Sequence, residues 1–265
     1  MKTRNGCLEG THPSKFVGAC ALAFIISLAA TIYSFRSMCC EMEMPGGWSM
    51  SMMWMRMPGQ TWIGSAATFL LMWLAMMIAM MLPSALPMFL NTRRSLIETR
   101  STNLRTSPAL LASGYFAIWL AAGAAVYALG IAFAATATRW ESFSRAVPVL
   151  SGVALIAAGA FQFTPCKMTG LLRCRSPIGC DSACPARETT FLLGCKQGAA
   201  CCVCCIPPMM IMLTLGMMNP FVMIAIALVI AAEKLLPRPE IIARLLGIAA
   251  IVTGVIIVPR NLLAS

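Results

Sequence analysis

WIGSAATFLLMWLAMMIAMMLPSALPMFL, residues 62–90, contains no charged side chain. A helix of this length, at about 1.5 Å per residue, is longer than the roughly 20 residues needed to cross the apolar core of a membrane. Pro83 and Pro87 lie in its last part, where proline kinks or ends a helix. The segment predicts a membrane-spanning helix that ends near Leu90.

Similar apolar runs recur along the 265-residue chain, which is 59% hydrophobic and 11% charged with a mean hydropathy of +0.81. They predict an all-α, polytopic transmembrane bundle that forms one domain over residues 1–265. The expected spans are residues 16–35, 62–90, 110–135, 147–164, 191–217, 219–236 and 245–258. That makes seven helices, or six if one of the two shortest runs (147–164 and 245–258) does not cross.

Two of these runs carry further local signals. The first is too long for a signal peptide and lacks a small-x-small cleavage site, so we expect an uncleaved helix. In the third, Gly114, Gly123 and Gly130 predict close approach of a neighbouring helix, because small residues let backbones of membrane helices meet.

The basic residues predict the orientation. If the N-terminus faces the cytoplasm, 15 of the 20 lysines and arginines fall in inner segments, and five fall outside: Arg36, Arg56, Arg139, Arg145 and Arg260. The positive-inside rule therefore predicts an N-in, C-out, multi-pass protein of the inner membrane. Residues 1–15 become a cytoplasmic tail, residues 38–61 an external Met-rich loop and residues 165–190 a cytoplasmic Cys-rich link. Since topology and lipid headgroups account for the charge, no nucleic acid is expected as a partner.

The external loop is dense in thioethers. Its core, EMEMPGGWSMSMMWMRM at residues 41–57, interleaves methionine with Glu, Ser, Gly and Arg instead of with apolar residues. Thioethers are soft ligands that select Cu(I) over harder cations. We predict that Cu(I) is captured there, with ligands among Met44, Met50, Met52 and Met55. The alternative is an amphipathic loop whose methionines lie on headgroups or on neighbouring helices.

A thioether ladder follows within residues 62–90. Met72, Met76 and Met80 are spaced four apart and share one helical stripe, and Met77 and Met81 form an adjoining stripe. Such a ladder could pass Cu(I) inward by ligand exchange. The alternative is that methionine serves only as an apolar helix former in lipid.

Cysteines gather in the second half of the chain. In CCVCC at residues 201–205, Cys201, Cys204 and Cys205 fall within one helical turn and are predicted to bind a soft ion. The spacing does not fit a zinc finger, and the alternative is that these cysteines only pack between helices. Pro207-Pro208 is expected to break the helix and free backbone carbonyls. The link holds Cys166, Cys174, Cys180 and Cys184, which are either a transient copper acceptor or loop thiols without function.

Few other residues suggest chemistry. Glu233-Lys234 is an ionisable pair at the inner end of its span, where it either serves function or anchors the helix at the interface. His12 is the single histidine and lies in the tail, which excludes sites built on histidine.

Several motifs together resemble the bacterial DUF2182 family of predicted metal-binding integral membrane proteins. They are MPGGWSMSM, FLLMWLAMMIAMMLPSALPM, FQFTPCKMTGLLRCRSPIG, LGCKQGAACCVCC, GMMNPFVM and AEKLLP, in the family's order between about Met42 and Ile251. The resemblance implies a membrane bundle that binds metal.

The family's motifs fall on numbered positions of this chain. Its AMM-x-AMM-x-P motif falls on residues 75–83, its CR-x-P segment on Cys174, Arg175 and Pro177, and its cysteine pair on Cys204 and Cys205. Where relatives tend to have Arg-His before a glycine this chain has Lys196-Gln197, and where they tend to have Trp after the cysteine pair it has Ile206. The first departure leaves a sulfur-only donor set, which favours Cu(I) over Zn(II).

These observations predict a membrane protein that handles Cu(I), either transporting it or delivering it for metalloprotein assembly, with the lipid bilayer and a soft metal ion as partners. No enzyme activity is expected, and the chain has no nucleotide-binding loop. Two alternatives remain at this level. One is a structural or assembly partner that binds no metal, and the other is a membrane redox protein.

Overall fold

The computed structural model describes residues 13–37, 41–55, 59–98, 108–175, 190–216 and 219–262. Its helices are α1 (Pro13–Ser37), α2 (Trp62–Glu98), α3 (Pro108–Arg139), α4 (Glu141–Phe161), α5 (Pro165–Arg175), α6 (Thr190–Leu215), α7 (Pro220–Leu235) and α8 (Pro239–Leu262). The predicted all-α bundle is confirmed, and a helix covers nearly the whole of each expected span. Within the described residues, six helices are long and apolar enough to cross a membrane, which leaves out α5 and the short α7.

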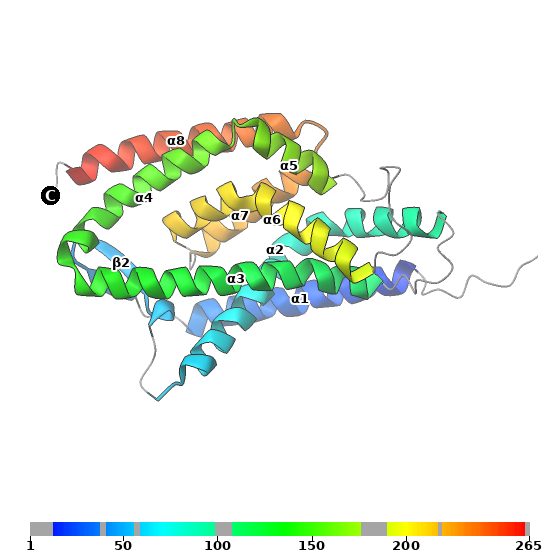
Figure 1. Cartoon of the computed structure of the whole chain (residues 1–265), viewed down its shortest axis with the longest axis horizontal. Coiled ribbons are helices and arrows are strands. Elements are labelled where there is room, and N and C mark those ends of the chain that lie inside the picture. The colour runs from blue at the N-terminus through cyan, green and yellow to red at the C-terminus, as the bar shows by residue number, and fades with distance from the viewer. Residues whose placement is uncertain are drawn as a thin grey trace, which may run out of the picture.

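The long helices run side by side along the molecule (Figure 1). In this view α4 and α8 form the upper layer, α6 and α7 the middle, and α1 and α3 the lower, while α2 runs obliquely from the lower edge to the level of α6. The described chain starts at one end of the bundle, with α1, and finishes at the other, with α8. Which end faces the cytoplasm stays a prediction.

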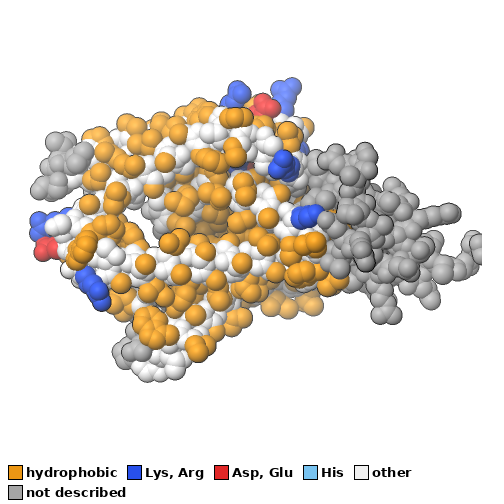
Figure 2. Space-filling model, in the orientation of Figure 1, with side chains coloured by type: hydrophobic (Ala, Val, Ile, Leu, Met, Phe, Trp, Pro, Cys, Tyr) orange, Lys and Arg blue, Asp and Glu red, His pale blue; other side chains and the backbone are white. Residues whose placement is uncertain are grey.

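The outer surface of the bundle is apolar. Figure 2 shows hydrophobic side chains along the visible face, with Lys and Arg near the two ends. Large side chains such as Ile25, Leu129 and Leu245 are more than half exposed. A continuous apolar surface of this size is unfavourable in water and suits a lipid environment.

Glycines set the distance between the helices that carry the site. A Cβ at Gly114 of α3 would collide with the carbonyl oxygen of Phe191, and one at Gly194 of α6 would collide with that of Leu111. Helices α3 and α6 therefore meet backbone to backbone, as the sequence predicts for Gly114. Gly123 and Gly130 instead make room for the rings of Trp73 and Trp54, respectively.

The Met-rich loop contains regular structure. Strands β1 (Glu41–Met44) and β2 (Trp48–Ser51) pair antiparallel and are followed by a 3-10 turn, η1 (Met52–Trp54). The connecting turn requires Gly46 and Gly47, whose φ angles are +105° and +72°. We call residues 41–55 the Met hairpin. It is held on α4, because the Trp48 indole donates to the Ser144 carbonyl at 3.0 Å. Residues 38–40 and 56–58 of the loop lie outside the described residues.

Two helices continue through prolines that the sequence predicts to kink, end or break them. The prediction that Pro207-Pro208 breaks its helix is wrong, since α6 continues to Leu215 with both prolines buried inside it. Helix α2 likewise runs through Pro83 and Pro87 to Glu98. Proline removes a backbone donor without ending a membrane helix when neighbouring groups satisfy the freed carbonyl. Residues 165–175 of the predicted Cys-rich link form helix α5, which lies outside the predicted spans.

Candidate metal centre

The buried stripe of α6 carries three cysteines. Cys201, Cys204 and Cys205 are each no more than 1% exposed. The Cys205 sulfur lies 3.9 Å from that of Cys201 and 3.7 Å from that of Cys204. The i, i+3, i+4 spacing thus places the three thiols together, as the sequence predicts.

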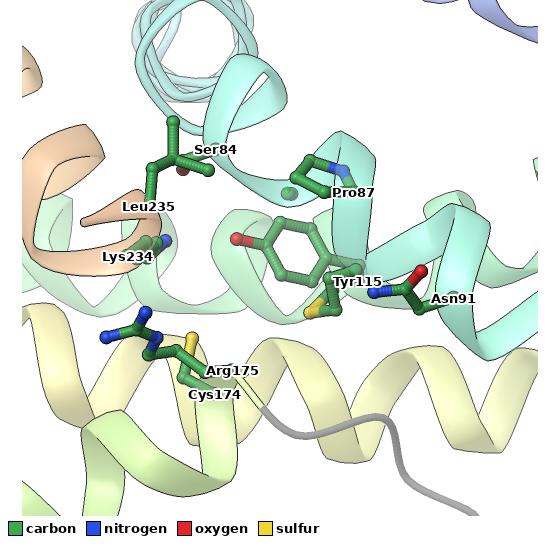
Figure 3. A pocket seen from close by; sticks show the side chains of 10 residues that line it. Ser84, Pro87, Asn91, Tyr115, Cys174, Arg175, Lys234 and Leu235 are labelled. Atoms are coloured by element: carbon green, nitrogen blue, oxygen red, sulfur yellow. The ribbon is translucent and has the colours of Figure 1, made fainter. Parts of the chain in front are cut away.

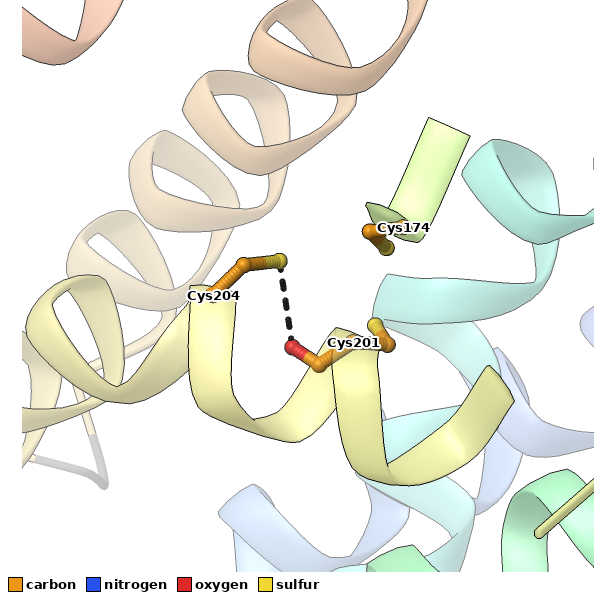
Figure 4. A group of neighbouring side chains, drawn as sticks. All are labelled: Cys174, Cys201 and Cys204. Carbon is orange, nitrogen blue, oxygen red and sulfur yellow. Dashed lines mark hydrogen bonds between the residues drawn. The ribbon is translucent and has the colours of Figure 1, made fainter. Parts of the chain in front are cut away.

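Helix α5 brings a fourth thiol to the same place. The helix starts at Pro165, and the Thr164 hydroxyl accepts a hydrogen bond from the Lys167 backbone N–H at 3.4 Å. Its buried residues, Lys167, Gly170, Leu171 and Cys174, follow helical spacing and face the bundle. As a result the sulfurs of Cys174, Cys201 and Cys204 all lie within 4.8 Å of one another (Figure 4). We call Cys174, Cys201, Cys204 and Cys205 the thiol centre.

The distances within the thiol centre fit a shared soft ion. Because a thiolate sulfur lies about 2.3 Å from a bound metal, two sulfurs on one ion are at most about 4.6 Å apart. The pairs at 3.7 and 3.9 Å satisfy this limit, and the group within 4.8 Å needs at most a small adjustment. A donor set of thiols with no described imidazole or carboxylate among them suits soft ions, which include Cu(I) and Zn(II).

Two polar side chains contact the Cys201 sulfur. The Tyr115 hydroxyl lies 2.9 Å from it, and the Lys234 amine donates to it at the same distance. Lys234 also approaches the Met81 thioether sulfur at 3.4 Å. Close packing of α3 on α6 positions Tyr115, while α7 supplies Lys234. Cys201 is therefore the thiol best prepared to carry negative charge, because both neighbours can donate to it.

A buried ion pair fixes α5 against α6 and α7. The Lys167 amine donates to the Glu233 carboxylate at 2.8 Å and to the Cys204 carbonyl oxygen at 2.7 Å. That carbonyl is free because Pro208, four residues later, has no N–H to donate. The freed carbonyl expected from Pro207-Pro208 is thus confirmed, and it anchors the helix that carries Cys174.

Cys174 differs from the other thiols in its position outside the candidate spans. Hydrogen bonding to Cys201 is the main reason why the pKa of Cys174 rises to about 12. Its thiol is therefore protonated at neutral pH in the metal-free protein. A metal that binds Cys174 must displace this proton.

The predicted methionine ligands are divided between the Met hairpin and the main core. Met44 and Met50 are buried in a separate cluster with Ala134 and Ala137, against which Met55 also packs. Of the others, Met52 is half-buried in η1, Met72 packs half-buried on the main core, and Met76 and Met80 are buried within that core, which also contains the thiol centre. Their role as copper ligands stays a prediction.

Sequence reasoning left four of these contacts out of the expected ligand set. Cys174 was expected in the link, as either a transient copper acceptor or a loop thiol without function, and its helical spacing from Lys167 is the signal that could have placed it at the thiol centre. Met81 belonged to the secondary stripe of α2, and Lys234 was noted only as an ionisable residue. Tyr115 gave no signal beyond its place next to Gly114. Cys180, Cys184 and His12 lie outside the described residues.

Comparison with known proteins identifies the family. A family model described as PpoB2, copper chaperone, matches residues 70–257, which is more than half of the chain. No curated protein and no solved structure gives a match. The matched region includes the whole thiol centre and its neighbours Met81, Tyr115, Lys167 and Lys234, and it excludes the Met hairpin. The chain therefore belongs to the PpoB2 family of copper chaperones.

Proposed function

We propose that this protein is a copper chaperone of the inner membrane that holds Cu(I) in the thiol centre and delivers it to a copper-dependent protein. The observation that carries the proposal is the convergence of four buried thiols from α5 and α6. Soft sulfur donors match Cu(I), and membership of a copper chaperone family agrees with copper as the cargo.

The surroundings of the thiol centre suit a metal that is held and then released. Bound copper supplies a soft Lewis acid that binds the thiolates, and the residues around it control their charge. Tyr115 and Lys234 stabilise negative charge on Cys201 through 2.9 Å contacts. Since Lys234 also meets Met81, the same side chain links the thiols to the thioether row of α2.

Delivery is favoured over transport by the placement of sulfur. The thiol centre is compact, whereas Met44 and Met50 at the Met hairpin pack against α3 residues. Capture by the Met hairpin and transit along Met72, Met76 and Met80 remain part of the proposal as a supply route. The resemblance to DUF2182 proteins also implies metal binding, and it stays a prediction.

The test is a titration of the reduced, purified full-length protein with Cu(I) under anaerobic conditions, in competition with a chromophoric Cu(I) chelator. We expect the wild-type protein to bind Cu(I), and Cys201→Ala to weaken binding by more than about 100-fold, because loss of a ligand exceeds the loss of an outer partner. Cys202→Ala is the matched control, since Cys202 is half-buried on the adjoining face of α6.

Two outcomes would contradict the proposal. One is a stoichiometry of zero in the wild-type protein, which would favour a structural or assembly role. The other is equal affinity of Cys201→Ala and Cys202→Ala, which would place copper away from the thiol centre. A visible absorption band of the purified protein typical of haem would favour the redox alternative.

A further inference from the structure

A cavity of about 240 Å³ adjoins the thiol centre where α2, α3, α5 and α7 meet (Figure 3). Its wall includes Cys174, Tyr115 and Lys234. Two of these, Tyr115 and Lys234, contact the Cys201 sulfur, and Cys174 is itself a member of the centre. The cavity therefore reaches the copper site directly.

Cys174 shares the wall of this cavity with the thioether residue Met88. Of the four thiols of the centre, it is the one that lines the wall, while Cys201, Cys204 and Cys205 are no more than 1% exposed. An ion or complex that arrives through the cavity meets Cys174 before the other three thiols of the centre. Exchange of copper must then begin on α5 before it reaches α6.

The charges around the cavity are positive. Arg175 and Lys234 line it, and the other described lining residues, which include Ser84 and Asn91, carry no carboxylate. The Arg175 guanidinium is held at the wall by donating to the Leu236 carbonyl at 2.8 Å. Because Lys234 also donates to the Cys201 sulfur, the Arg175 guanidinium is the charge that disfavours a bare cation here and attracts an anion.

The size of the cavity limits the ligand. Its volume lies below the about 300–1,000 Å³ of pockets that enclose drug-sized ligands. A small thiol complex fits this space, and a folded domain does not. Cu(I) held by two thiolates carries a net negative charge, which matches the cationic wall.

We propose that this cavity is the port through which copper is exchanged, and that its ligand is an anionic Cu(I) complex of a low-molecular-weight thiol. The inference rests on the proposed function of the thiol centre. In the first step a Cu–S bond to Cys174 forms and a Cu–S bond to the carrier breaks. The Cys174 proton passes to the departing carrier thiolate, and copper remains Cu(I).

Charge-selective thiol modification tests the port without copper. The reduced, metal-free full-length protein is treated with two methanethiosulfonates of similar size, one bearing a sulfonate and one a quaternary ammonium. Modification at Cys174 is followed by peptide mass spectrometry, and each rate is divided by that of a free small thiol. At Cys174 we expect the normalised rate of the anionic reagent to exceed that of the cationic reagent by about tenfold or more.

Internal controls distinguish the effect of the cavity on reagent selectivity from the effect of the protein's net charge. Cys166 is exposed on the same helix, so its modification reports the charge selectivity of a thiol outside the cavity. Arg175→Gln is expected to reduce the charge selectivity at Cys174 to that at Cys166, whereas Arg175→Lys is expected to retain it. Arg173→Gln changes an exposed residue of α5 and is expected to leave the selectivity at Cys174 unchanged. Equal selectivity at Cys166 and Cys174, or no effect of Arg175→Gln, would overturn the proposal.

Copper loading distinguishes this inference from the proposed function. Stopped-flow loading from an anionic bis-thiolate Cu(I) complex is expected to be about tenfold slower in Arg175→Gln, with the final stoichiometry unchanged. Normal stoichiometry with an unchanged rate would remove the port and leave the chaperone proposal intact. Zero stoichiometry in the wild-type protein would remove the chaperone proposal, while the reagent selectivity would still report on the cavity.

Discussion

The thiol centre and the Met hairpin are both rich in sulfur, but their sulfurs have different neighbours. In the thiol centre, four cysteines from two helices converge, and Tyr115 and Lys234 contact one of them. In the Met hairpin, Met44 and Met50 pack against small α3 residues. Sulfur content therefore predicts a metal site only where the fold directs several sulfurs to one point and places polar partners beside them.

The largest expected difference between the two regions is in pH dependence. Because the pKa of Cys174 is about 12, its thiol stays protonated from pH 6 to pH 8, and copper must displace that proton. Copper affinity therefore rises with pH, by about 100-fold over this range for each proton displaced. We expect competition titrations to show this rise, and the slope in Cys174→Ser to be smaller by one proton. A thioether site has no proton to lose, so a pH-independent affinity would point to the methionines.

The second difference concerns the polar neighbours of the thiols. Tyr115→Phe removes the hydroxyl that lies 2.9 Å from the Cys201 sulfur while retaining the ring that packs on Phe89. Since outer partners contribute about 10–100-fold to metal affinity, we expect Cu(I) binding to weaken by at least about tenfold.

The matched control for Tyr115→Phe lies on the same helix. Tyr127 donates its hydroxyl to Ser65 at 3.0 Å, outside the thiol centre. Tyr127→Phe is expected to leave the copper affinity unchanged in the same competition titration. If both variants weaken binding equally, the hydroxyl of Tyr115 has no specific role at Cys201.

The smallest effect is expected at the Met hairpin. Replacement of Met44 and Met50 by Leu retains apolar volume, so each change should cost less than about 1.5 kcal/mol of unfolding free energy. We also expect the high-affinity copper stoichiometry to stay unchanged. Chemical denaturation in detergent and the anaerobic titration measure these two quantities. A lost copper equivalent would show that thioethers of the Met hairpin bind the ion after all.

Local chemistry accounts for most of what could be predicted. Long uncharged runs identify the spans, because an apolar helix of sufficient length has few other stable environments. The i, i+3, i+4 spacing of Cys201, Cys204 and Cys205 requires one helical turn, so the sequence places these thiols together once the helix is assigned. The predicted helix break at Pro207-Pro208 was wrong, because the donor that satisfies the freed carbonyl comes from another helix, which local sequence does not reveal.

Tertiary structure alone brought α5 onto α6, and with it Cys174 to Cys201 and Cys204. It also supplied Tyr115 and Lys234 from helices far apart in the chain, and it packed Met44 and Met50 against α3. The physical reason is that helical periodicity fixes only which residues share a face. Which faces meet depends on glycine contacts such as that of Gly114 with Phe191, on the buried Lys167–Glu233 pair, and on the carbonyl that Pro208 leaves free.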